Sequence, residues 1–249
     1  MNRKAKYIIA AGLILLTIHF VYYCNKTETV LVSGKVFGFD IQSTEKNEIN
    51  EDKELIPTAL KKIGTITFKK SDNNTFAALG HSIKEIGNSN SISGECYNIN
   101  LDEIQKSENN NPGKIVAELN KDEKIGTLEK TNNYGVFGKM EIKENSNLVE
   151  IETNNRYSIR KGDAEILIDI DGNGLKRYEI EITKINYFHK NQNLQIRIKS
   201  QELIEKTGGI IQGMSGAPIL QNNKLVGAVN FMSSKDPITA YGIFVDKLL

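Results

Sequence analysis

The sequence predicts a mainly β protein built from two small barrels or sandwiches, and three observations support this fold class. Alternating or β-branched runs recur from about residue 63 onward. Clusters of Gly, Asn, Asp and Pro separate these runs at close intervals, as in barrels and sandwiches. The candidate catalytic residues His81 and Ser215 lie 134 positions apart (215 − 81), which leaves room for a second β unit.

The first expected strands are residues 63–68 and residues 75–83, and the second of these contains His81 at its end. Turn-forming residues are expected to interrupt the chain at 87–94 and 109–113. Further strands are expected at 114–118, 126–128, 134–138, 165–170, 175–182, 194–198, 219–220, 225–229 and 241–245. The strands 219–220 and 225–229 are joined by the polar turn 221–224, which predicts a β-hairpin.

Composition excludes several classes of function. The chain has 249 residues, with 32 Lys and Arg against 31 Asp and Glu, so its net charge of +1 gives no electrostatic reason to bind nucleic acid. Cys24 and Cys96 are the two cysteines, and two free thiols are expected in preference to one long-range disulfide. No cluster of Cys and His has the spacing of metal ligands, so neither a metal nor a cofactor is expected.

One acidic string resembles a calcium loop but is interpreted as a turn. Asp169, Asp171 and Asn173 have the spacing that opens an EF-hand loop. Ile180 stands where that loop needs a bidentate glutamate, and the flanking residues are strand-like instead of helical. The Asp-Gly and Asn-Gly pairs are ordinary hairpin signals, so a β-hairpin is expected here.

The N-terminal residues 1–26 are interpreted as an uncleaved membrane anchor. Three basic residues precede Tyr7, and residues 7–23 are 17 positions without a charge. No small-x-small cleavage site follows, and the basic end predicts that the rest of the chain lies outside the cytoplasm. Residues 27–60 are interpreted as a short strand and linker, and residues 61–249 as the main domain.

The stretch 208–231 carries the strongest chemical signal. Ser215 follows Gly213 by two positions, precedes Gly216, and lies three positions before Pro218. A serine on such a sharp turn can approach a substrate carbonyl, and the N–H groups of Gly213 and Ser215 could form an oxyanion hole. This pattern favours acyl transfer. The alternative is a glycine-rich turn whose serine only caps the chain.

His81 is the candidate general base. It follows the small and apolar residues 77–80 at the expected end of a strand, where a base can approach neighbouring backbone closely. The alternative is an ordinary surface or core histidine. Of the other two histidines, His19 falls in the apolar N-terminal segment and His189 in a polar stretch, so neither has the context of His81.

Several of these segments together resemble the SpoIVB serine peptidase family. The resemblance is carried by GGIIQGMSGAPI at 208–219, LVGAV at 225–229 and DPITAYGIFVDKLL at 236–249. ALGH at 78–81 matches the family motif that holds its catalytic histidine, and KIGTL and YGVFG at 124–128 and 134–138 are similar to family segments. The similarity extends from about residue 63 to the C-terminus.

The resemblance implies a chymotrypsin-like double β-barrel with serine endopeptidase activity. Ser215 would be the nucleophile and His81 the general base, in a membrane-anchored protease of sporulation signalling. The implied location is the space between mother cell and forespore, and the implied partner is a protein substrate, which can include the chain itself. Relatives carry a PDZ domain before the protease, but about forty residues are too few for one here.

The third member of a catalytic triad is left open by the sequence. Relatives place a functional aspartate about fifteen residues before the serine, and Ser200 occupies that position in this chain. A serine can accept a hydrogen bond from histidine but cannot supply a negative charge. Several carboxylates could substitute: Asp102, Asp122, Asp163, Asp169, Glu202 and Glu205.

Three interpretations therefore remain. The first is a membrane-anchored serine endopeptidase, which the intact Ser215, Gly213 and His81 favour. The second is a pseudoprotease with the same fold that binds or regulates without cutting, which the serine at position 200 favours. The third is a structural protein of the cell envelope whose serine turn is coincidental.

Overall fold

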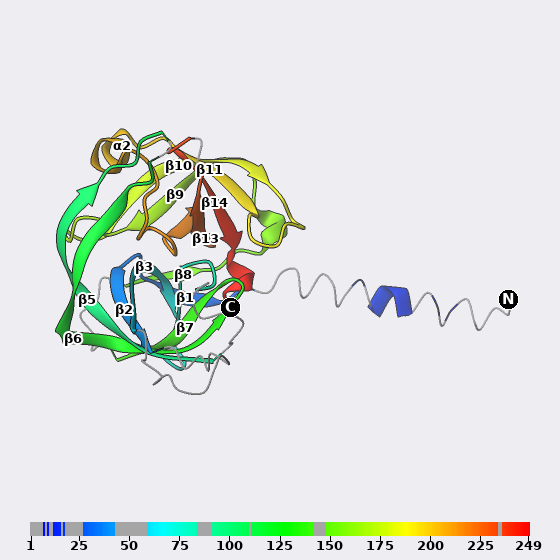
Figure 1. The fold of residues 1–249 in the computed structure, drawn as a ribbon. Helices are drawn as coiled ribbons and strands as arrows, with labels where there is room; N and C mark the ends of the chain where they lie inside the picture. The colour runs from blue at the N-terminus through cyan, green and yellow to red at the C-terminus, as the bar shows by residue number, and fades with distance from the viewer. Residues whose placement is uncertain are drawn as a thin grey trace, which may run out of the picture.

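The structure is a computed structural model that describes residues 7, 9, 12–15, 17, 27–42, 59–83, 91–109, 111–141, 148–233 and 236–249. The described part of the chain forms two β-barrels, which lie one above the other in Figure 1. The mainly β fold with two six-stranded units, expected from the sequence, is confirmed.

The first barrel contains six strands from the N-terminal half of the described chain. These are β2 (Val36–Gln42), β3 (Ala59–Lys69), β4 (Thr75–Ala78), β5 (Ser91–Gln105), β6 (Lys114–Asn132) and β7 (Gly135–Met140). They follow the order β2-β5-β6-β7-β4-β3, and pairing of β2 with β3 closes the ring. Strands β1 (Thr29–Val32) and β8 (Val149–Glu152) extend the sheet from β3.

The second barrel contains the remaining strands. These are β9 (Gly162–Ile168), β10 (Lys176–Ile185), β11 (Leu194–Ile198), β12 (Pro218–Gln221), β13 (Lys224–Met232) and β14 (Thr239–Phe244). They close in the order β10-β11-β14-β13-β12-β9. Three short helices lie between or after the strands of the barrels: η2 (Arg156–Ser158), α2 (Gln201–Thr207) and η3 (Val245–Lys247).

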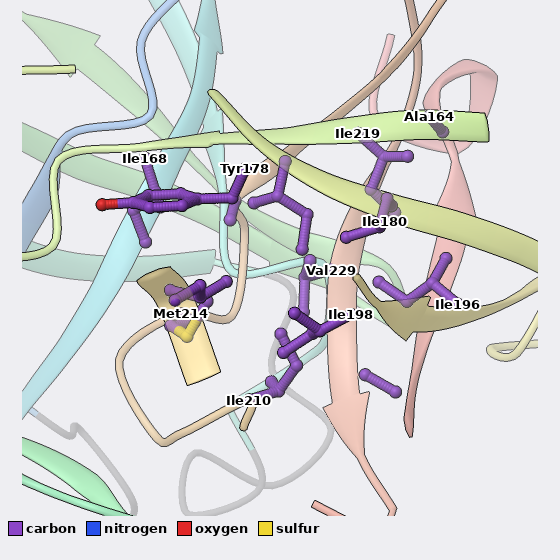
Figure 2. Close-up of a cluster of buried hydrophobic side chains, with 14 of the residues drawn as sticks. Ala164, Ile168, Tyr178, Ile180, Ile196, Ile198, Ile210, Met214, Ile219 and Val229 are labelled. Carbon is purple, nitrogen blue, oxygen red and sulfur yellow. The ribbon is translucent and has the colours of Figure 1, made fainter. Parts of the chain in front are cut away.

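Hydrophobic residues alternate along these strands, and they fill each barrel and the space between the two. Figure 2 shows the interior of the second barrel, where Met214 lies among isoleucines that include Ile198 and Ile210. A separate cluster in the first barrel surrounds Phe37 and Phe76. A third cluster takes its members from strands of both barrels, so burial of apolar surface also holds the barrels together.

Two expectations about strand boundaries need correction. Strand β2 is a full member of the first barrel, although residues 27–60 were expected to be a short strand and linker ahead of the domain. Seven β2 residues pair with β3, so the first barrel could not close without them. The second expected strand ends at Ala78, because Leu79 and Gly80 have positive φ values of 71° and 66°, which no strand accommodates.

The residues from 91 to 132 form two long strands, not the several short ones expected. Gly94 was expected in a turn but lies inside β5, where it pairs with β2 and β6. The outer parts of the two strands, from Asn98 to Gln105 in β5 and from Lys114 to Lys124 in β6, pair with each other beyond the barrel. Figure 1 shows this two-stranded ribbon rising from the first barrel along the side of the second. We call it the β5–β6 ribbon.

Other expectations are confirmed or lie outside the described residues. Strands β9 and β10 form the expected hairpin around Asp171, and β12 and β13 form the expected hairpin through Asn222 and Asn223. Cys96 is a buried free thiol, and burial raises its pKa. Most of residues 1–26, including Cys24, lie outside the described residues. Among the described ones, no helix has the length and apolar character needed to cross a membrane.

Candidate active site

His81 and Ser215 line the same cleft. Its volume is about 1240 Å³, and it lies where the two barrels meet the β5–β6 ribbon. His81 comes from the first barrel, directly after β4, and Ser215 comes from the loop before β12 in the second barrel. The end of β13 adds Asn230 and Phe231 to the wall. Each barrel therefore contributes one of the two residues.

Met214 anchors the loop that carries Ser215. Its side chain is fully buried in the core of the second barrel, as Figure 2 shows, and it lies between Gly213 and Ser215 in sequence. Ser215 itself is only partly buried. Its hydroxyl donates a 3.1 Å hydrogen bond to the Asn230 carbonyl oxygen. A hydroxyl has one proton to donate, so transfer of this proton to a base requires the side chain to rotate.

Strand β3 of the first barrel binds the carbonyl groups of this loop. The Thr65 hydroxyl donates to the Gly213 oxygen at 2.7 Å, and the Thr65 N–H donates to the Ser215 oxygen at 2.8 Å. The Thr67 hydroxyl donates to the Gly216 oxygen at 2.7 Å. Both threonine side chains are buried, so these bonds are shielded from water.

The carbonyl groups therefore point toward the first barrel, which leaves two amide groups of the loop available. Within the part of the chain that the structure describes, the N–H groups of Gly213 and Ser215 donate to no protein acceptor, whereas the Gly216 N–H donates to the Val229 oxygen at 2.8 Å. Gly213 and Ser215 both line the cleft, and a pair of unengaged backbone N–H donors is what an oxyanion hole uses.

Close contact between the barrels requires glycine at position 216. Gly216 has a φ of 97°, and a Cβ there would lie 2.0 Å from the Thr65 oxygen and 2.6 Å from the Leu79 nitrogen. Gly80 makes a similar approach from the other side, since a Cβ there would lie 2.7 Å from the Val229 oxygen. The backbones that precede His81 and follow Ser215 can thus pack directly against the opposite barrel.

Two neighbours fix the His81 ring. Its face stacks on Phe231 of β13, with the ring centroids 5.4 Å apart and the planes 16° from parallel. Its Nδ1 lies 2.9 Å from the Ser82 carbonyl oxygen. A carbonyl can only accept a hydrogen bond, so this contact assigns the proton to Nδ1 and leaves the lone pair on Nε2. A neutral histidine in that tautomer can accept a proton from a nucleophile.

Ser200, at the family's third position, lies at the start of α2. Its side chain accepts a hydrogen bond from the Leu203 N–H as the N-cap of the helix, and its own N–H donates to the Glu179 oxygen. Among the described residues, neither Ser200 nor any of the six carboxylates named above lines the cleft. Asp163 is bound to Lys199, and Glu202 to Lys176 and Lys206.

The β5–β6 ribbon forms one wall of the cleft and brings charged side chains to it. Its exposed side chains at the cleft include Glu108, Lys114, Glu118 and Lys121. Asp40 of β2 lies 2.6 Å from the Lys121 ammonium, and this hydrogen bond raises the pKa of Lys121. With Lys61 and Lys62 of β3 included, four lysines and two glutamates line the cleft, so its charge is positive.

Several features of the candidate site were not predicted from the sequence. Thr65 and Thr67 occupy alternate positions of β3 and lie on one face of the strand. Two polar residues in that pattern, on a face expected to be buried, indicate hydrogen-bond partners in another part of the chain. The Asn230 carbonyl and the Phe231 ring belong to a strand that was predicted, but no local pattern indicates what they contact. The wall formed by the ribbon depends on strand lengths that were underestimated.

Two β-barrels with a serine and a histidine on the walls of one cleft define the architecture of a chymotrypsin-like serine peptidase. The family model described as SpoIVB peptidase S55 matches residues 35–249. The chain belongs to this family of serine peptidases. The match includes β2 and therefore agrees with the earlier start of the domain seen in the fold.

A search of curated proteins gives no match. Among solved structures, the chain is similar to an HtrA-type protease, AlgW with a tripeptide, at 12% sequence identity and a TM-score of 0.46. That similarity covers 88% of this chain and 58% of AlgW, so the chain spans less than two thirds of that protein. The inactive form of the Rv3671c protease of M. tuberculosis H37Rv is similar at 11% identity and a TM-score of 0.39, over 85% of this chain and 88% of that one.

Proposed function

We propose that this chain is a membrane-anchored serine endopeptidase that cuts a protein substrate outside the cytoplasm as part of sporulation signalling. Membership of the SpoIVB peptidase family supports the reaction class. The signalling role follows from the resemblance to that family. The 17 uncharged residues 7–23, preceded by basic residues, support the anchor and the extracytoplasmic location.

Ser215 is the nucleophile in this proposal. Its hydroxyl rotates away from the Asn230 carbonyl and attacks the carbonyl carbon of the scissile peptide bond, while Nε2 of His81 takes the proton. The tetrahedral intermediate carries a negative oxygen, which the N–H groups of Gly213 and Ser215 stabilise. His81 then donates its proton to the leaving amine, and a water molecule hydrolyses the acyl-enzyme by the same route in reverse.

The observation that carries this proposal is the hydrogen bonding of the nucleophile loop. The backbone oxygens of Gly213, Ser215 and Gly216 are all bound by Thr65 and Thr67. A loop held by its carbonyl groups in this way keeps its free N–H groups fixed in direction, and fixed donors stabilise a developing charge without reorganisation. A serine that merely caps a turn needs no such support.

The test uses the purified full chain in detergent, with fluorescently labelled casein as the substrate and a fluorophosphonate as a serine-reactive probe. Wild type is expected to cleave casein and to react with the probe, and Ser215→Ala is expected to do neither. Losses after removal of a catalytic serine reach about 10⁶-fold in kcat in well-studied proteases. His81→Ala should be nearly as inactive, because an unactivated hydroxyl is a poor nucleophile. Cleavage by Ser215→Ala at the wild-type rate would exclude Ser215 as nucleophile.

The second candidate is a pseudoprotease that binds a protein without cutting it. Two observations favour it: the Ser215 hydroxyl is engaged by the Asn230 carbonyl, and position 200 holds a helix-capping serine in place of an aspartate. In that case wild type and Ser215→Ala would both be inert toward casein and the probe, and they would bind a protein partner equally well.

A further inference from the structure

The outer half of the β5–β6 ribbon contacts the second barrel next to residues 212–216, the loop that carries Ser215. At the tip, the Ser107 N–H donates to the Thr207 oxygen at 2.7 Å. The Gln212 N–H donates to the Gly113 oxygen, and the Ile115 N–H donates to the Gln212 oxygen, both at 2.9 Å. Residues 113–115 thus pair in parallel with Gln212, which directly precedes Gly213.

A two-stranded ribbon is not stable by itself in water, and apolar contacts with the second barrel stabilise this one. Ile115 is 95% buried (5% exposed) and belongs to the core cluster of the second barrel. Ile99, Leu101, Ile104 and Ala117 are partly buried against the same cluster. One face of the ribbon is therefore apolar and covers the second barrel, although both of its strands originate in the first.

Within this docking, the Ile115 side chain packs directly against Gly213. Gly213 has a φ of 104°, and a Cβ built on it would lie 2.7 Å from Cδ1, 3.0 Å from Cγ1 and 3.1 Å from Cβ of Ile115. The Ile115 side chain therefore lies against the Cα of Gly213. On its other side the Gly213 carbonyl accepts the Thr65 hydroxyl bond.

A positive φ at glycine is easily changed, because glycine has several accessible backbone conformations. The direction of the Gly213 N–H is thus not set by the local sequence. It is restrained by Thr65, which holds the next peptide unit through the Gly213 carbonyl, and by Ile115, whose side chain lies against the Gly213 Cα. Rotation of the peptide between Gln212 and Gly213, which carries this N–H, would also break the hydrogen bond from the Ile115 N–H to the Gln212 oxygen.

We propose that Ile115 is a positioning residue for peptide hydrolysis, and that the docked β5–β6 ribbon holds Gly213 with its N–H directed into the cleft. The inference rests on the proposed function, in which that N–H is one of two oxyanion donors. Ile115 touches Gly213 and acts through it, and it takes no part in proton transfer. Its effect is therefore expected in kcat more than in KM.

The test compares Ile115→Ala with Ile104→Ala in the full chain. Ile104 is the cross-strand partner of Ile115, faces the same barrel, and is not part of the cleft wall. Casein cleavage is expected to lose about 10- to 100-fold in kcat in Ile115→Ala, within the range for a misplaced oxyanion donor, with KM changed less than threefold. Ile104→Ala should keep kcat within about twofold of wild type. Ile115→Val, which retains Cβ and Cγ1, should restore most of the lost rate.

A second readout does not depend on activity. In chain labelled with ¹⁵N-glycine, the Gly213 amide resonance, assigned through Gly213→Ala, should shift in Ile115→Ala and stay in place in Ile104→Ala. Equal kcat values for the two alanine variants, with an unmoved Gly213 resonance, would overturn the inference. If wild type cleaves nothing, the proposed function fails, and the Gly213 resonance alone then decides whether Ile115 positions that amide.

Discussion

The Thr65 hydroxyl donates a 2.7 Å hydrogen bond to the Gly213 carbonyl oxygen. This bond joins a strand of the first barrel to the loop of the second barrel that carries Ser215. Thr65 is fully buried, and the same residue binds the Ser215 oxygen through its backbone N–H. One residue therefore holds the carbonyl groups on either side of Met214, those of Gly213 and Ser215. The shape of the candidate oxyanion site is determined across the boundary between the barrels, not within either of them.

Thr65→Val should reduce both stability and activity. Valine has nearly the same shape but no hydroxyl, so the buried Gly213 oxygen loses its partner at a cost of about 1–3 kcal/mol. The peptide between Gly213 and Met214 also loses the bond that holds its carbonyl, and casein cleavage is expected to fall at least about 10-fold in kcat. Thr65→Ser keeps the hydroxyl and should recover most of the rate. An unchanged kcat in Thr65→Val would show that this bond does not support catalysis.

Two glycine substitutions distinguish the stability lost through backbone strain from the stability lost through a steric clash. Gly174 and Gly216 have similar φ values of 105° and 97°, but a Cβ on Gly174 meets nothing within 4 Å, whereas one on Gly216 lies 2.0 Å from the Thr65 oxygen. Gly174→Ala should cost about 1 kcal/mol of unfolding free energy from strain alone. Gly216→Ala should cost at least about 3 kcal/mol, because the barrels must also move apart. Urea unfolding of both variants measures the difference, and equal losses would contradict the packing described here.

Ser200 offers a test of its role at the family's third position. As the N-cap of α2, it should tolerate aspartate, which also caps helices, and lose about 1 kcal/mol of stability on change to alanine. Neither Ser200→Asp nor Ser200→Ala should change kcat by more than about twofold, since the side chain lies outside the cleft wall. A large rise in activity in Ser200→Asp would instead place this position beside the imidazole.

Acid stability should depend on Asp171. The hydrogen bond from the Lys206 ammonium lowers the pKa of this carboxyl, and a further bond from the Asn173 N–H acts in the same direction. A carboxyl with a lowered folded-state pKa stabilises the fold above its unfolded value of about 3.9, and that contribution disappears as the pH falls through the folded-state pKa.

Asp171→Asn should therefore be less stable than wild type at pH 6, and the difference should shrink toward pH 2. Unfolding free energies measured by urea titration across this range give the comparison. Asp102→Asn, a change at an exposed position of the ribbon, is the control for loss of one negative charge. A constant difference between wild type and Asp171→Asn from pH 6 to pH 2 would contradict the assigned ion pair.

Local patterns were sufficient to predict most of the second barrel. Strands β9 to β14 have clear alternation or apolar runs, and turn residues with strong preferences separate them, such as Asn222 and Asn223 with φ values of 52° and 61°. The short helix α2 was missed, although Ser200 at its N-cap and Gly208 at its left-handed C-cap are recognisable signals. Seven residues make only about two helical turns, too few to show the 3.6-residue spacing of apolar positions.

The site could be predicted only in part, because its remaining features depend on distant residues. His81 and Ser215 have local motifs and were found from them. The Thr65 and Gly213 contact joins residues 148 positions apart, and the stacking of His81 on Phe231 joins residues from different barrels. No property of either residue alone specifies such a partner, so these contacts become visible only when the barrels are placed together.

The docking of the two barrels has a consequence for the timing of activity during synthesis. Thr65 and Thr67 leave the ribosome long before Gly213 and Gly216, their partners 148 and 149 positions later. Contacts with such sequence separation form late in folding, because closing a long loop costs entropy. A chain still being translated therefore has no shaped site with which to cut its own unfolded segments or the proteins around it. Under the proposed function, hydrolysis would begin only after Gly213 and Gly216 have bound Thr65 and Thr67 of the first barrel.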